Sequence, residues 1–195
     1  MTLRIRLSLL TLAFVFGIAK AQANDFARFF ASFESLSADF HQVLLDAQNR
    51  PLESSQGQLI FVRPGGLRWQ TDSPSQQVLL LNNQQLYLID YELEQVSQRS
   101  LETVDNTPIY WLARSPETLE TLPEHSHSHQ GIDWYRAGEH LSFGFQAARL
   151  HSIRHTNGLA QTILVQLDNL VIDPEIDPQQ LQPTVPAGFD LIKLF

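Results

Sequence analysis

Residues 25–35 of the chain read DFARFFASFES, and this stretch decides how the fold begins. Its aromatic residues are spaced i, i+3, i+4 and i+7, so a helix places all of their rings on one face. They are Phe26, Phe29, Phe30 and Phe33. Asn24 or Asp25 can cap this helix, which is predicted to end near Leu36. An aromatic face of this width is expected to pack on an apolar surface formed by the rest of the chain.

Beyond Leu36 the apolar residues recur with a period close to two, which predicts β-strands. Turn sequences such as Pro64-Gly65-Gly66, Asn82-Asn83 and Asn157-Gly158 separate the predicted strands. Their close spacing along the chain predicts an antiparallel meander. The predicted strands cover residues 38–46, 57–63, 67–71, 77–81, 85–91, 95–100, 133–137, 141–146, 150–155 and 159–172.

Two further helices are predicted over residues 107–114 and 115–122, the first opened by Asn106-Thr107-Pro108. Residues 173–195 are rich in Pro and Asp and are predicted to form an irregular tail with a short final strand. The sequence therefore predicts a mainly β (α+β) domain, in which helices pack on the concave side of a strongly curved sheet. The four phenylalanines then either cover the mouth of a hollow or fill it as ordinary core.

Residues 1–23 have the pattern of a signal peptide. Arg4 and Arg6 precede an apolar run over residues 7–19, and Ala21-Gln22-Ala23 is a small-x-small cleavage signal. We therefore expect export to the periplasm and cleavage after Ala23, which leaves residues 24–195 as a single domain. The alternative, a retained membrane anchor, is disfavoured because the apolar run is short for a bilayer span.

The chain contains no cysteine, so it can form no disulfide and offers no lipobox thiol for acylation. Residues 1–23 hold three of the 13 basic residues and none of the 21 acidic ones, so the remainder carries a formal charge of about −11. Nucleic acids and anionic lipid headgroups repel such a surface. The composition predicts a protein that moves freely in its compartment and has no nucleic-acid partner.

The segment His125-Ser126-His127-Ser128-His129 has the most enzyme-like composition in the chain. An extended strand would place three imidazoles on one side, and zinc accepts three histidines plus water. The simpler interpretation is a polar loop, so no metal and no cofactor are expected. Nucleophile motifs, H-E-x-x-H and the phosphate-binding P-loop are absent from the sequence, and carboxylate pairs such as Asp90 with Glu92 are ordinary surface alternation. The sequence predicts a binding protein and not an enzyme.

Three motifs occur in order along the chain. The first is Phe61-x-Arg63-Pro64-x-x-x-Arg68-Trp69, followed by Pro74 and Val78-Leu79-Leu80-Leu81. The second is Asp105-Asn106-Thr107-Pro108 leading into Leu112-Ala113-Arg114, and the third is Val185-Pro186-x-Gly188-Phe189-Asp190. Together with the signal peptide and Phe40-x-Gln42, this ordered set resembles the LolA family of periplasmic outer-membrane lipoprotein carriers. The resemblance covers essentially the whole of residues 24–195.

The resemblance implies an incomplete antiparallel β-barrel of about ten to eleven strands, lidded by two or three helices and enclosing an apolar cavity for the acyl chains of lipoproteins. It also implies a soluble periplasmic chaperone. Such a chaperone takes lipoproteins from an inner-membrane ABC transporter and passes them to an outer-membrane lipoprotein receptor. A monomer is expected, because one lipidated cargo in one cavity needs no second subunit. The alternative is a carrier of the same fold for another lipid or a lipid-linked pigment.

In the family, the arginine of the Arg-Pro loop closes the lid by hydrogen bonding to helix backbone, and the matching residue is Arg63. Phe30 is the expected helix residue beneath that contact. Residues two apart on a strand lie on the same face, so Leu67 shares a face with Trp69 and Leu86 with Leu88. This alternation does not decide which face is inside. The expected cavity wall consists of Phe29, Phe33, Phe40, Phe61, Trp69, Leu80, Leu86, Leu88, Ile109 and Trp111.

Overall fold

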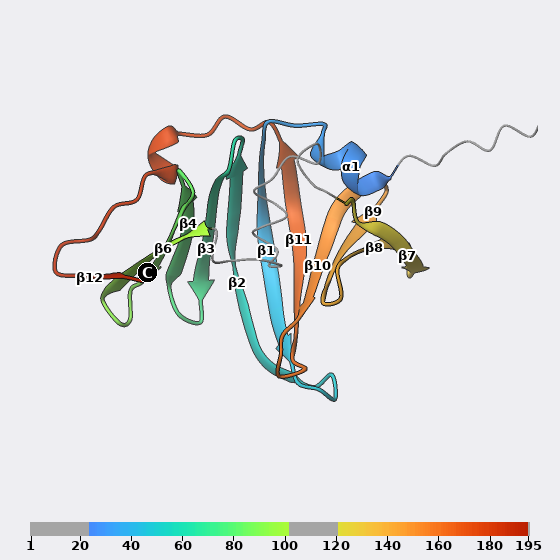
Figure 1. The fold of residues 1–195 in the computed structure, drawn as a ribbon, viewed down its shortest axis with the longest axis horizontal. Helices are drawn as coiled ribbons and strands as arrows, with labels where there is room; N and C mark the ends of the chain where they lie inside the picture. The colour runs from blue at the N-terminus through green and yellow to red at the C-terminus, as the bar shows by residue number, and fades with distance from the viewer. Residues whose placement is uncertain (1–23, 102–120, 195) are drawn as a thin grey trace, which may run out of the picture.

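The computed structural model describes residues 24–101 and 121–194, in which twelve strands form one open sheet (Figure 1). The strand order is β12-β6-β5-β4-β3-β2-β1-β11-β10-β9-β8-β7. In chain order, the strands are β1 Ser35–Leu45, β2 Pro51–Val62, β3 Gly66–Ser73, β4 Gln77–Asn82, β5 Gln85–Asp90, β6 Gln95–Ser100, β7 Glu124–His129, β8 Ile132–Ala137, β9 Leu141–Gln146, β10 Arg149–Thr156, β11 Thr162–Ile172 and β12 Asp190–Lys193. In the described ranges the helical elements are α1, Asp25–Phe30, and the 3₁₀ turn η3, Pro178–Leu181.

Two antiparallel meanders make up eleven of the twelve strands, one from β1 to β6 and one from β7 to β11. They join where β1 pairs with β11 in the middle of the sheet, as Figure 1 shows. Strands β7 and β12 are the two ends of the strand order, so the sheet is open and not closed into a barrel. None of the helices in the described ranges has the length and hydropathy needed to cross a bilayer.

The predicted strands agree with the structure, in two cases to the residue, at β6 and β9. Strand β7 was not among the ten predicted strands, because residues 124–129 are polar and exposed throughout. Strand β12 pairs parallel with β6, which departs from the predicted antiparallel sheet. The helix predicted over residues 107–114 and most of the one over residues 115–122 lie outside the described residues.

The first helix is shorter than the pattern predicts and ends at Phe30 instead of near Leu36. Asn24 caps its start, and its side-chain oxygen accepts from the backbone N–H of Phe26 at 3.0 Å. Leu36 lies instead in β1, paired with both β2 and β11. The two sheet ladders and the burial of Leu36, which is 1% exposed, outweigh the helical spacing of the preceding residues.

Residues that pair across adjacent strands lie on the same face of the sheet, so the strand pairings assign the side chains to two layers. The face that carries Leu36, Phe40, Leu59 and Phe143 is called the inner face, and α1 packs on it over β9 and β10. The opposite, outer face has a smaller core of its own. Its members are Val78, Leu80, Ile89 and Val96, covered by Leu181 and Phe189 of the C-terminal tail.

Gly57 occupies a place where β2 and β3 approach closely. The register shifts between Gln56 and Gly57, and a Cβ added at Gly57 would lie 1.8 Å from the backbone oxygen of Gln70. The strands must therefore separate to accept any side chain at this position.

We expect Gly57→Ala to lower the free energy of unfolding by about 2 kcal/mol, because the clash is with backbone and not with a movable side chain. Gly158→Ala is the control, since a Cβ there meets no atom within 4 Å. Urea unfolding of both variants measures the difference. Equal stability of the two variants would contradict the close approach.

Candidate functional site

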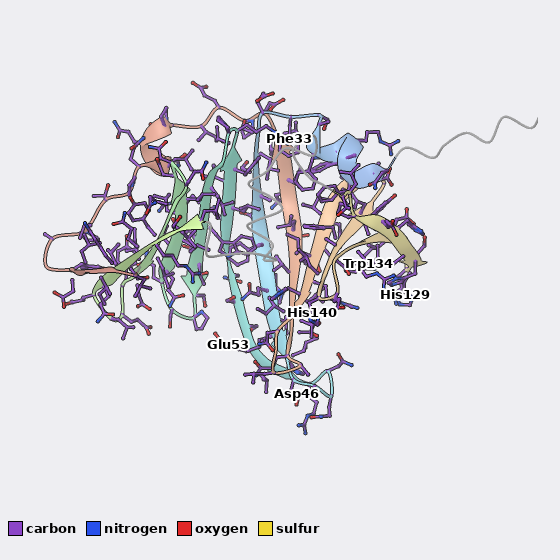
Figure 2. The ribbon with its side chains drawn as sticks, in the orientation of Figure 1. Phe33, Asp46, Glu53, His129, Trp134 and His140 are labelled. Carbon is purple, nitrogen blue, oxygen red and sulfur yellow. The ribbon has the colours of Figure 1, made fainter. Side chains whose placement is uncertain are left out.

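The phenylalanine stripe is ordinary core in this structure. Phe26, Phe29, Phe30 and Phe33 are 1%, 4%, 1% and 4% exposed. Although Phe33 lies beyond the end of α1, its ring centroid is 5.2 Å from that of Phe29. The rings continue into the sheet, where Phe26 lies 5.0 Å from Phe143, and Phe33 lies 6.1 Å from Phe61. The stripe therefore fills the inner face at the end of the sheet where Figure 2 labels Phe33.

An apolar pocket of about 260 Å³ adjoins this aromatic core on the inner face. Trp69 forms one wall and packs on Phe40 with ring centroids 4.4 Å apart. The pocket is built jointly by both meanders, from strands β1, β3, β4, β10 and β11. Its lining consists of Gln42, Trp69, Leu79, Ile153, His155, Ile163 and Val165. A hollow with this lining suits a hydrocarbon chain.

The expected cavity residues divide into several groups. Trp69 lines the pocket, whereas Phe29, Phe33, Phe40, Phe61 and Leu86 are buried in the inner core beside it. Leu88 shares the inner face by its pairing with Leu79 and is 37% exposed. Ile109 and Trp111 lie outside the described residues.

Leu80 does not belong with the expected cavity wall. It points to the outer face of β4 and is buried there with Val78 and Ile89. Its neighbour Leu79 has the opposite parity and lines the pocket. In a run of consecutive leucines the sequence could not distinguish the two faces, and pairing with Trp69 decides between them.

Arg63 ties the end of α1 to the loop after β2. Its Nε donates to the carbonyl oxygen of Phe33 at 3.0 Å, and a terminal nitrogen donates to the carbonyl oxygen of Phe30. The guanidinium carbon also lies 5.2 Å from the ring centroid of Phe33 and 5.7 Å from that of Phe61. Hydrogen bonds from a charged donor contribute about 1.5–3 kcal/mol each, so this one side chain can hold the helix end against the sheet.

Two other hollows are more polar. One of about 420 Å³ lies between the loop at residues 62–66 and tail residues 174–182, with a mixed lining. The other, of about 580 Å³, lies beside β7 and is lined by polar and acidic residues that include Asp25, Glu124 and Asp133. Neither lining offers the continuous apolar wall that an acyl chain needs.

The histidine segment forms strand β7 instead of the expected polar loop, but it does not gather three imidazoles. A register shift between His125 and His127 places them opposite Tyr135 and Trp134, which are consecutive on β8 and so face opposite ways. The ring of His127 stacks on Trp134 with an interplanar angle of 13°. Within the described ranges, no group of three or more His, Cys, Asp or Glu side chains is arranged to hold a metal.

The pocket contains one titratable side chain, His155. Burial lowers the pKa of His155, and the nearby His140 lowers it further. Figure 2 labels His140 toward the end of the sheet opposite Phe33. The lowered pKa keeps the imidazole of His155 neutral at neutral pH. A neutral ring suits a pocket with an apolar wall.

Comparison with known proteins identifies the family that this chain resembles. A family model described as outer membrane lipoprotein carrier protein LolA matches residues 31–184. An outer-membrane lipoprotein carrier protein from Chromohalobacter salexigens is 31% identical over 189 residues, which cover 90% of each chain. One from Coxiella burnetii is 26% identical over 191 residues, 91% of this chain and 90% of that one. The solved structure of a LolA superfamily protein from Nitrosomonas europaea shares the fold, with a TM-score of 0.51 at 10% identity over 82% of this chain and 94% of that one.

The lowered pKa of His155 predicts a pH dependence of stability. The unfolded chain binds a proton near pH 6.5 and the folded chain binds it only at lower pH, so the contribution of His155 to stability is complete above pH 6.5 and is lost below it. We expect an NMR titration midpoint for His155 below 6.5 and a flatter dependence of stability on pH between 7 and 5 in His155→Gln.

In His140→Gln the midpoint of His155 should rise but stay below 6.5, because burial is the larger cause. A midpoint of His155 at or above 6.5 in the wild-type protein would show that the imidazole is not desolvated.

Proposed function

The chain belongs to the LolA family of outer membrane lipoprotein carrier proteins, and on this premise we propose that it binds the acyl chains of lipoproteins in the inner-face pocket. The observation that carries the proposal is an apolar pocket of about 260 Å³ beside a filled aromatic core. Each methylene that leaves water contributes about 0.8 kcal/mol, so an acyl chain gains on the order of 10 kcal/mol by burial. Free lipoprotein would therefore not leave a membrane without a carrier.

The carrier we propose is a soluble monomer of the periplasm. It receives lipoproteins from an inner-membrane ABC transporter and delivers them to an outer-membrane receptor. The formal charge of about −11 on residues 24–195 supports this, because such a surface does not adhere to anionic lipid headgroups. The proposed activity needs no cofactor, no metal and no catalytic residue.

The proposed lid consists of α1 and the turn that follows it, held by Arg63. Support comes from the donation of Arg63 to the carbonyl oxygens of Phe30 and Phe33, which are the last helical residue and part of the following turn. Releasing these bonds would let α1 move away from β9 and β10 and enlarge the hollow beside Trp69. The cost of opening then offsets part of the gain from acyl burial, which keeps the cargo transferable.

The composition of co-purified lipid tests the carrier function. Protein isolated from periplasm should carry triacylated lipoproteins, detected by pull-down and by mass spectrometry of organic extracts. Ile163→Glu, which places a charge in the pocket, should reduce the bound cargo at least tenfold. Leu164→Glu is the matched control, because Leu164 is an equally half-buried neighbour on the other face of β11 and should retain cargo.

The identity of the extracted molecule separates the two carrier functions. Recovery of a free lipid or a pigment, without lipoprotein, would favour the alternative carrier. If the wild-type protein carried no lipid and bound no added acyl probe, the pocket would not be a cargo site.

Arg63→Leu should leave loading of lipoprotein intact and slow its transfer to acceptor membranes or receptor at least tenfold. The reason is that the variant loses the interactions that favour the closed lid, so the cargo-bound open state becomes too stable to release. Arg68→Leu is the control, because Arg68 contacts Gln70 and Gln180 away from α1. Normal transfer by Arg63→Leu would overturn the gating role.

A further inference from the structure

Two polar side chains interrupt the otherwise apolar wall of the pocket. Gln42 of β1 and His155 of β10 line it together with aromatic and aliphatic residues. The pairings of β1 and β10 with β11 place both on the inner face, opposite Val165 and Ile163 respectively. Both side chains are half-buried.

Neither side chain has a hydrogen-bond partner among residues 24–101 and 121–194. Some other glutamines of the sheet do have such partners. Gln77 donates to Asp90 at 2.8 Å, and Gln98 donates to Gln85 at 3.2 Å. A bound hydrocarbon chain would displace water from both side chains, and polar groups removed from water without a partner cost about 1–3 kcal/mol. A pocket that only enclosed hydrocarbon would therefore gain by replacing Gln42 and His155 with apolar residues.

The two groups offer donors that match a specific feature of acylated molecules. The Gln42 amide supplies two N–H donors, and a neutral imidazole supplies one. Because burial lowers the pKa of His155, its ring is neutral at neutral pH and suits a neutral acceptor better than an anion. An ester or amide carbonyl oxygen is such an acceptor, and it lies at the head of every acyl chain.

We propose that Gln42 and His155 donate hydrogen bonds to the carbonyl oxygens that link acyl chains to the cargo. The pocket then selects ester- or amide-linked acyl chains over alkyl chains of the same length. This inference rests on the proposed function, because it names the chemical group that the same pocket recognises beyond hydrocarbon. It also fixes how far an acyl chain enters, since the carbonyl must stop at the level of Gln42 and His155.

Two ligands that differ by a single carbonyl test this inference. Monopalmitin carries its chain through an ester, and hexadecyl glycerol ether carries a chain of equal length through an ether. Each is titrated below its critical micelle concentration into the protein, with binding followed by calorimetry. We expect the wild-type protein to bind the ester about five- to tenfold more tightly, the ratio that one or two net hydrogen bonds supply.

The double variant Gln42→Leu/His155→Leu should bind both ligands with equal affinity and keep its affinity for the ether. His41→Leu is the control, because His41 precedes Gln42 on the exposed, opposite side of β1 and should keep the preference for the ester. Thermal unfolding verifies that each variant is folded.

The outcomes separate this inference from the proposed function. Equal affinity of the wild-type protein for the two ligands, or an ester preference that survives in the double variant, overturns the carbonyl contact and leaves acyl binding in place. Binding of neither ligand by the wild-type protein overturns both.

Discussion

The pairing of β1 with β11 is the contact on which the rest of this structure depends. It joins a meander from the first half of the chain to one from the second half, and the pocket of the inner face is lined by residues of both. The pocket takes Gln42, Trp69 and Leu79 from one side of this junction, and Ile153, His155, Ile163 and Val165 from the other. The same pairing places α1, which packs on β9 and β10, within reach of Arg63 at the end of β2. Slippage of this ladder by one residue would turn Gln42 away from the inner face, opening the pocket wall.

Local sequence patterns predicted most of the strands because apolar and polar residues alternate along a half-buried strand. This alternation can be seen without knowing which strands pair with it. The same patterns could not decide which face is inside. Leu79 and Leu80 illustrate this limit, because only the pairing of Leu79 with Trp69 shows that Leu79 lines the pocket and Leu80 faces the tail. Gln42 and His155 were not expected in the pocket for a similar reason. A polar residue in a strand usually marks the solvent side, and here it marks the pocket.

The end of α1 and the presence of β7 show where tertiary contacts outweigh local preference. Helical spacing extends through Phe33, but the carbonyl oxygens of Phe30 and Phe33 are taken by Arg63, a residue 30 positions away from Phe33. Strand β7 has no apolar alternation, and it is held in the sheet by its ladder with β8. Neither partner can be read from a short window of sequence, so neither the end of α1 nor the presence of β7 could be predicted from local residues.

The division of the fold into two cores on opposite faces suits the proposed carrier role. A lid that opens must expose apolar surface without unfolding the sheet beneath it. The outer core of Val78, Leu80, Ile89 and Val96 is covered by the tail and shares no member with the inner core, so movement of α1 leaves it intact. The sheet ladders between β1 and β11 are likewise independent of α1. The proposed opening would cost the contacts of α1 and Phe33 with β2, β8, β9 and β10 and the hydrogen bonds of Arg63, while the outer core and the sheet ladders stay in place.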